Sequence, residues 1–143
     1  MSIKEKIRII IDANVWVDFA IGHHVHRLRD ILYNKNNIVF ICTEIENEFL
    51  KAVTQSERIR KYVKQKRIDD TIDLMNTFCI SKKHHSDINV SRDAKDNYLL
   101  GFSINCKANF LITGDNDLLV LQKFKNTLII ELPVFLELVD RKI

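Results

Sequence analysis

Five short apolar segments, separated by longer stretches with helical spacing, restrict the folds that this chain can adopt. The first, Ile7–Ile11, contains four isoleucines, is too short for a helix and is bounded by Asp12. We therefore interpret it as a strand buried on both faces. The segments that resemble it are Ile38–Cys42, a weaker one at Thr77–Ile80, Asn109–Thr113 and Thr127–Leu132.

The stretches between these segments repeat apolar residues at the spacing of an amphipathic helix. The repeated positions are Val25, Leu28, Ile31 and Leu32; Ile45, Phe49, Leu50 and Val53; Ile68, Ile72 and Met75; and Tyr98, Leu99, Phe102 and Cys106. Ser91 or Asp93 is placed to cap the last of these helices, a short helix is expected after Asp117, and Pro133 suits the first turn of a final one. Alternating strands and helices need crossover connections, which produce a parallel sheet with helices on both faces. We therefore expect an α/β fold with three layers, α/β/α.

The composition is that of one globular domain, residues 1–143. The chain has 46% hydrophobic residues and a net charge of +3, and its three glycines and one proline leave no flexible linker. No apolar run approaches the roughly 18 residues of a membrane span, and the first residues lack the apolar core of a signal peptide. We expect a cytoplasmic protein without membrane contact. Cys42, Cys79 and Cys106 are widely spaced, and we expect them to be buried free thiols.

Aspartates follow two of the predicted strands. Asp12 comes directly after the first strand, and Asp115 and Asp117 follow the fourth in LITGDNDLL. Each could be an ordinary turn residue or helix cap. In open parallel sheets, however, ligands bind beyond the carboxyl ends of the strands, where the strand order reverses. If the first and fourth strands are neighbours at that point, Asp12 and Asp115 converge.

Other acids are placed to join them. Glu44 and Glu48 lie one helical turn apart after the second strand, and Asp93 and Asp96 open the helix before the fourth. Glu44, Asp93 and Asp96 could instead serve only as partners of a helix dipole. Glu48 precedes two apolar residues on the half-buried side of its helix, so we expect it to face the cluster.

Carboxylates gathered without Lys or Arg between them repel one another, and a bound cation removes that conflict. Oxygen ligands select a hard ion such as Mg²⁺ or Mn²⁺, which suits phosphodiester hydrolysis. Asn14 would orient a ligand or water beside the ion, and Thr113 would hydrogen-bond the carboxylate of Asp96 or Asp115. The histidines, His84 among them, lack helical ligand spacing and a cysteine partner, and we expect them in solvated loops.

Four segments resemble motifs of the PIN-domain family, in particular the VapC-like ribonucleases that are toxin components of bacterial toxin-antitoxin systems. They are IIIDANVWV, ENEFLKAV, SRDAKDNYLL and LITGDNDLL, which occur in this order over almost the whole chain. Asp18 stands where many relatives carry a serine or another small residue. The resemblance implies a mainly parallel five-stranded sheet ordered 3-2-1-4-5, a homodimer and an antitoxin partner.

The resemblance also implies roles for the acids. It indicates a metal-dependent ribonuclease that holds one or two Mg²⁺ or Mn²⁺ ions. The implied catalytic residues are Asp12, Glu48, Asp96 and Asp115, the implied metal ligands are Asp12, Asp96, Asp115 and Asp117, and Asp93 occupies a supporting acidic position.

One basic run, Arg58–Arg67, holds six basic residues and no acid. On a single helix, Arg60, Lys64 and Arg67 would form one stripe at i, i+4 and i+7. Such a stripe is either a solvated helix face or a surface that contacts the phosphate backbone of RNA.

Our hypothesis is an endoribonuclease in which metal-activated water attacks an RNA phosphodiester in line, leaving a 5′-phosphate and a 3′-hydroxyl. One alternative is a catalytically silent RNA-binding module of the same fold. Another is a receiver-like signalling domain, but the third strand ends in Ser81 and Lys82 rather than in an aspartate. A dinucleotide-binding enzyme is disfavoured because the first strand is followed by DANVWV and not by a glycine-rich turn.

Overall fold

The sheet of the predicted α/β fold is present, with one strand more than expected. A computed structural model describes residues 5–84 and 94–140 of the chain. Its six-stranded sheet has the order β3-β2-β1-β4-β6-β5. The strands are β1 (Ile7–Ile11), β2 (Asn37–Ile41), β3 (Cys79–Ser81), β4 (Phe110–Ile112), β5 (Lys123–Phe124) and β6 (Thr127–Ile130). The five predicted strands keep the expected order 3-2-1-4-5, since β6 is the fifth of them; β5 is a two-residue edge strand antiparallel to β6.

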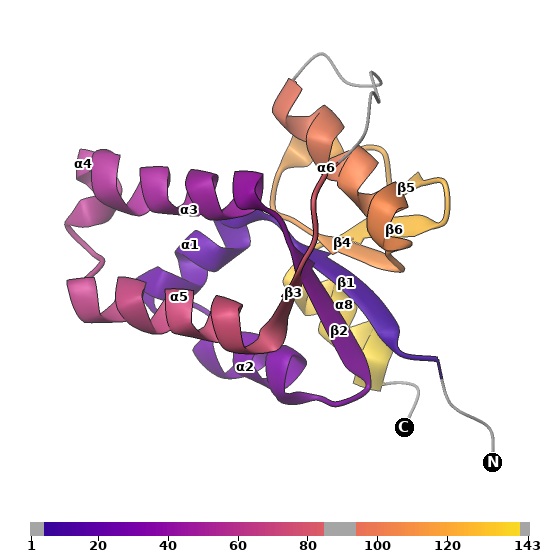
Figure 1. The fold of residues 1–143 in the computed structure, drawn as a ribbon, viewed down its shortest axis with the longest axis horizontal. Coiled ribbons are helices and arrows are strands. Elements are labelled where there is room, and N and C mark those ends of the chain that lie inside the picture. Colours follow the sequence, from indigo (N-terminus) through magenta and orange to yellow (C-terminus); the bar gives the residue numbers. More distant parts are fainter. Residues whose placement is uncertain (1–4, 85–93, 141–143) are drawn as a thin grey trace.

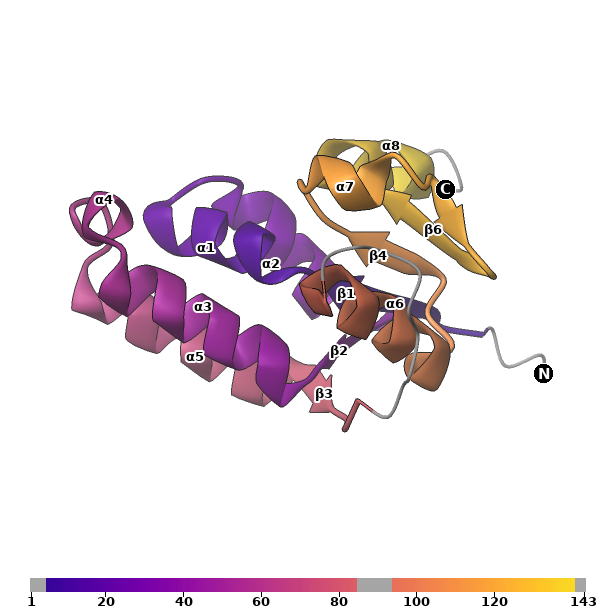
Figure 2. The ribbon, with the colours of Figure 1, turned by 90° about the horizontal axis from the view of Figure 1, so that it is seen from above.

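Helices cover both faces of the sheet, which confirms the three-layer architecture. They are α1 (Ala13–Ile21), α2 (Val25–Tyr33), α3 (Thr43–Gln55), α4 (Glu57–Arg60), α5 (Gln65–Phe78), α6 (Ala94–Cys106), α7 (Asn116–Leu119) and α8 (Leu132–Asp140). Helices α6 and α8 lie on opposite sides of the sheet, and α3 and α5 run side by side and pack against α1 (Figures 1 and 2).

Three local predictions need correction. Helix α1 was not expected, because six of its nine residues are buried and its sequence has little amphipathic period. Helix α5 continues to Phe78, so β3 begins only at Cys79 rather than at Thr77. The short helix α7 begins at Asn116, before Asp117, because Asp115 is its N-cap.

Strand β1 is the centre of the core and fixes the position of the acidic residues. Ile9, Ile10 and Ile11 have no exposed surface, as expected for a strand buried on both faces. The strand pairs in parallel with β2 on one side and with β4 on the other, and Ile11 lies opposite Ile112. Because these two residues end their strands at the same level, the residues that follow them meet at one edge of the sheet.

The cysteines are free thiols, as predicted, with Cys42 and Cys106 buried and Cys79 partly buried. Burial is the main cause that raises the pKa of Cys42 and of Cys79 from 9.0 to about 12. Burial likewise raises the pKa of Cys106 to about 11. All three thiols therefore stay protonated near neutral pH. Within the described ranges, no helix is long and apolar enough to cross a membrane.

Candidate acidic site

Asp12, Thr113 and Asp115 form one hydrogen-bonded chain at the carboxyl ends of β1 and β4. The Thr113 hydroxyl donates to Asp12 Oδ2 over 2.8 Å and accepts from the backbone N–H of Asp115 over 3.0 Å. The backbone N–H of Asp12 donates to the carbonyl of Ile112 over 2.9 Å, which continues the ladder between the two strands. The expected convergence of Asp12 and Asp115 is therefore present.

Both aspartates are also helix caps. The interpretation as a cap and the interpretation as a ligand-binding carboxylate therefore apply to the same residues. Asp12 Oδ1 accepts from the N–H of Ala13 over 2.7 Å at the start of α1. Asp115 Oδ1 accepts from the N–H of Asp117 over 3.0 Å at the start of α7. Capping fixes both carboxylates at the sheet edge, with Asp12 fully buried and Asp115 partly exposed.

The partner predicted for Thr113 was wrong in one respect. We expected its hydroxyl to bond the carboxylate of Asp96 or Asp115. It bonds the carboxylate of Asp12 instead and contacts Asp115 through the backbone. The reason is the strand register: Thr113 follows Ile112, which pairs with Ile11, so its side chain lies beside Asp12.

Asn14 stands in the first turn of α1 and is partly buried. Its Oδ1 atom is enclosed, yet it accepts no hydrogen bond from residues whose side chains the structure describes. A buried amide oxygen without a partner is costly, so this atom is suited to receive a hydrogen bond from water or a ligand at the site. Asp117, by contrast, is exposed on α7.

Tyr98 on α6 links the site to Glu48 on α3. Its ring is partly buried, and its hydroxyl is enclosed without a hydrogen-bond partner in the described part of the chain. Burial raises the pKa of Tyr98 most strongly, and the nearby charges of Glu48 and Asp12 raise it further. The charges of the partly buried Glu48 and the buried Asp12 therefore both act on this phenol.

Sequence reasoning missed Tyr98 as a site residue, because it occupies an apolar position in the helical pattern. The available signal was its polar tip, since a buried tyrosine hydroxyl normally needs a partner. His84 was also placed wrongly in a solvated loop. Its ring packs edge-to-face on Tyr98 with centroids 5.8 Å apart, and the residue is partly buried.

Two predicted residues lie outside this description. Asp93 falls in the segment that the structure does not describe, and Asp96 is described only as part of the backbone of α6. Among the side chains that are described, no group of three or more His, Cys, Asp or Glu residues is arranged to hold a metal ion. The described part of the site therefore consists of Asp12, Asp115 and Glu48 with their polar neighbours.

The predicted basic stripe is not one helical face, and that part of the prediction is wrong. Arg60 ends α4, Lys64 caps α5, and Arg67 lies within α5. The Arg67 guanidinium donates to the carbonyls of Phe19 over 2.6 Å and Ala20 over 3.4 Å, so this residue is held against the end of α1. Contact of the three residues with nucleic acid stays a prediction.

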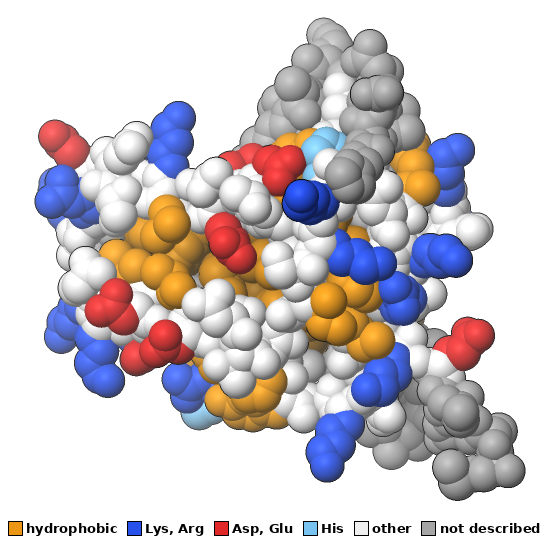
Figure 3. Space-filling model, viewed as in Figure 1, with side chains coloured by type: hydrophobic (Ala, Val, Ile, Leu, Met, Phe, Trp, Pro, Cys, Tyr) orange, Lys and Arg blue, Asp and Glu red, His pale blue; other side chains and the backbone are white. Residues whose placement is uncertain are grey.

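Other basic residues gather elsewhere. Figure 3 shows Lys and Arg side chains spread over the face that carries strands β1 to β3. Two of them flank the buried Phe40 ring: the Arg8 guanidinium lies 4.7 Å and the Lys82 ammonium 5.5 Å from its centroid. These contacts show that part of the excess positive charge covers one face of the sheet at the inner strand β2.

Comparison with known proteins agrees with this arrangement. A search of curated proteins found no match. Among solved structures, the crystal structure of VapBC2 from Rickettsia felis bound to a DNA fragment from its promoter is similar, with a TM-score of 0.56 and 14% identity. The similarity covers 86% of this chain and 97% of that one, and it concerns the fold. Residues 8–117 match the PIN domain, a span that includes most of β1, Glu48, α6 and both aspartates after β4. The chain therefore belongs to the PIN-domain family.

Proposed function

We propose that this protein is a Mg²⁺- or Mn²⁺-dependent endoribonuclease that hydrolyses RNA phosphodiester bonds. PIN domains of the VapC type are typically nucleases, and PIN nucleases generally use divalent metal ions. The observation that carries the proposal is the chain of hydrogen bonds from the Asp12 carboxylate through the Thr113 hydroxyl to the backbone N–H of Asp115. It brings two aspartates from distant parts of the sequence to the edge where α/β folds bind ligands.

The donor atoms of the site fit a hard divalent ion. The candidate ligands Asp12, Asp96, Asp115 and Asp117 all offer carboxylate oxygens, which suit Mg²⁺ or Mn²⁺ better than zinc. Asp12 Oδ1 accepts from the N–H of Ala13 and Oδ2 accepts from the Thr113 hydroxyl, so both oxygens of this carboxylate are held in a defined orientation. A bound ion would activate water and stabilise the charge that develops on the phosphate.

The protein's own residues would hold the reacting groups in place. Thr113 and the N–H of Ala13 fix the rotamer of Asp12, and the start of α7 fixes Asp115. The free Asn14 Oδ1 would accept a hydrogen bond from a water or from a ribose hydroxyl. Glu48, across the site on α3, would act as the base or as a further carboxylate toward the cation, and Asp93 would support Asp96 at the start of α6.

An antitoxin partner and a homodimer belong to the same proposal. They are supported by the similarity of fold to VapBC2, whose structure was determined with promoter DNA. Family membership removes the receiver-like alternative. A cleavage assay distinguishes the proposed enzyme from the alternative, a protein of the same fold that binds RNA without cleaving it.

The test is incubation of the purified protein with single-stranded and structured RNAs in Mn²⁺, Mg²⁺ or chelator. Cleavage is expected with either metal, and chelator should stop it. Asp12→Asn and Asp115→Asn should abolish cleavage, whereas Asp73→Asn, which changes an exposed aspartate of α5, should not. If the Asp12→Asn protein is folded and cleaves RNA normally, the proposal is wrong.

A further inference from the structure

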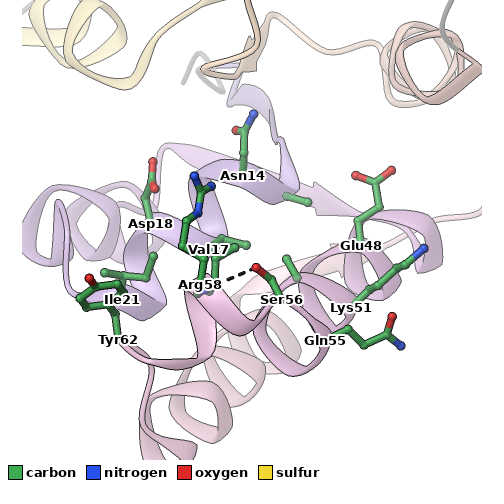
Figure 4. Close-up of a pocket in the computed structure, with 13 residues that line it drawn as sticks. Asn14, Val17, Asp18, Ile21, Glu48, Lys51, Gln55, Ser56, Arg58 and Tyr62 are labelled. Atoms are coloured by element: carbon green, nitrogen blue, oxygen red, sulfur yellow. Dashed lines mark hydrogen bonds between the residues drawn. The ribbon is translucent and has the colours of Figure 1, made fainter.

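A groove beside the acidic site is formed by α1, α3 and α4. It has a volume of about 940 Å³. Its apolar surface comes from Ala13, Val17, Ile21, Ala52 and Ile59. Figure 4 shows these walls facing one another, with polar side chains along the edges.

The groove is continuous with the acidic site. Asn14 and Glu48, which belong to that site, also line the groove. In Figure 4 both side chains lie at one end, and Tyr62 lies at the other, beside Ile21. A polymer whose scissile bond reaches the carboxylates could therefore extend along α1 and α3 toward Tyr62.

Two cations stand on the walls of this groove. Lys51 projects from α3, one turn after Glu48, and Arg58 projects from α4. Both are exposed, and neither forms an ion pair with any residue in the described ranges. The guanidinium of Arg58 reaches across toward Asn14 and Asp18 (Figure 4). Unpaired cations beside an acidic centre are suited to phosphates that flank a reacting one.

The far end of the groove offers an aromatic face. Tyr62 is 68% exposed and lies where the chain passes from α4 to α5. Exposed aromatic rings bind single-stranded nucleic acids by stacking on bases, at about 1–3 kcal/mol per base. A base stacked there would also cover the neighbouring apolar side chain of Ile21.

We propose that this groove binds the single-stranded RNA nucleotides that flank the scissile phosphate, with Arg58 and Lys51 on backbone phosphates and Tyr62 against a base. The inference rests on the proposed nuclease function for the reaction at the acidic end. An apolar wall alone would suit a peptide equally well. The unpaired cations, the exposed ring and the continuity with the acidic site favour RNA.

The charged residues of the groove predict opposite effects on RNA affinity. Asp18 lies on the same edge as Arg58 and repels phosphate. Asp18→Asn should therefore strengthen RNA binding, whereas Arg58→Ala should weaken it and lower the salt dependence of binding by about one unit of slope.

The experiment measures binding of a fluorescent single-stranded RNA of about ten nucleotides by the full chain, in chelator, so that no cleavage occurs. Arg58→Ala is compared with Arg27→Ala, which changes an exposed arginine of α2 that does not line the groove. Tyr62→Ala is compared with Tyr33→Ala, which is 53% exposed at the end of α2. We expect each groove variant to bind at least about five-fold more weakly, as loss of about 1 kcal/mol implies, and each control to stay within two-fold of wild type.

Equal affinities of the groove variants and their controls would overturn the inference, as would a protein that binds no RNA. If an amphipathic peptide binds in the groove, and Arg58→Ala and Tyr62→Ala leave the RNA affinity unchanged, the occupant is a protein and the inference is wrong. Failure of the nuclease proposal gives a different pattern: the wild type would bind RNA through Arg58 and Tyr62 but cleave none with Mn²⁺.

Discussion

Thr113 Oγ1 and Asp12 Oδ2 are joined by a 2.8 Å hydrogen bond between side chains 101 residues apart in the sequence. Both side chains are buried, and the same hydroxyl accepts the backbone N–H of Asp115. One threonine thus connects the carboxyl ends of β1 and β4 and sets the relative position of the two aspartates.

Replacing Thr113 by valine should lower both stability and cleavage. The change leaves Asp12 Oδ2 and the Asp115 N–H without this partner in a buried place, which costs about 1–3 kcal/mol. Urea unfolding should show that loss, and RNA cleavage in Mn²⁺ should fall because the Asp12 carboxylate is no longer held. Thr113→Ser keeps the hydroxyl and should restore most of both. If Thr113→Val and Thr113→Ser lower stability and cleavage equally, the loss is not caused by the missing hydrogen bond.

Much of this arrangement could be predicted from the sequence. Polar residues mark the ends of the apolar strands in the sequence, since Asp12 follows β1 and Thr113 follows β4. Parallel pairing of the two strands then places both residues at one edge of the sheet. The hydrogen-bond partner of Thr113 could not be predicted, because it depends on the register between β1 and β4. Helix α1 gave no amphipathic signal, because it is buried on most sides.

The basic run shows a second limit of local patterns. No glycine or proline interrupts Arg58–Arg67, so a continuous helix was expected, but the chain turns between Arg60 and Gln65. The contact that holds Arg67 is with α1, far away in the sequence. Long-range contacts of this kind leave no periodic trace in the sequence.

Divalent metal should stabilise the folded protein. A ligand that binds only the native state raises its stability, and three or more carboxylates without a cation repel one another. Thermal unfolding with and without Mn²⁺ should show an increase in Tm for the wild type and for Asp73→Asn. The increase should be smaller for Asp115→Asn, which removes one charged ligand. An equal increase in all three proteins would show that the ion binds elsewhere.

Arg67→Ala should lower the stability of the folded protein. The guanidinium bonds two carbonyls at the end of α1 and lies 5.1 Å from the centroid of the Phe19 ring. Charged hydrogen bonds of this kind contribute about 1.5–3 kcal/mol each. We expect a clear drop in the free energy of unfolding by urea for Arg67→Ala and almost none for the exposed Arg60→Ala. A larger drop for Arg60→Ala than for Arg67→Ala would show that the hydrogen bonds from Arg67 to the end of α1 contribute little to stability.

Alkaline pH should destabilise the protein through its buried thiols. The pKa of Cys42 is raised from 9.0 to about 12 in the folded state by burial, so at pH above 9 the unfolded chain loses this proton while the folded chain keeps it. The free energy of unfolding should therefore fall between about pH 9 and 12, by up to about 1.4 kcal/mol per pH unit for each such thiol. Urea unfolding at pH 8, 9 and 10 tests this, and Cys42→Ala should reduce the slope. An unchanged slope in that variant would contradict the role of Cys42.

Tyr98→Phe should separate function from stability. The Tyr98 hydroxyl is enclosed next to Glu48 and has no hydrogen-bond partner among the described residues, so its removal leaves no new unpaired group on the protein. Urea unfolding should therefore give the same or a slightly higher free energy. If the hydroxyl donates to a carboxylate or water of the working site, cleavage in Mn²⁺ should fall by roughly ten-fold or more, as for other groups that orient metal-site ligands. Tyr33→Phe, at an exposed position, is the control and should change neither quantity. Full cleavage by Tyr98→Phe would show that the phenol only fills space between α6 and α3.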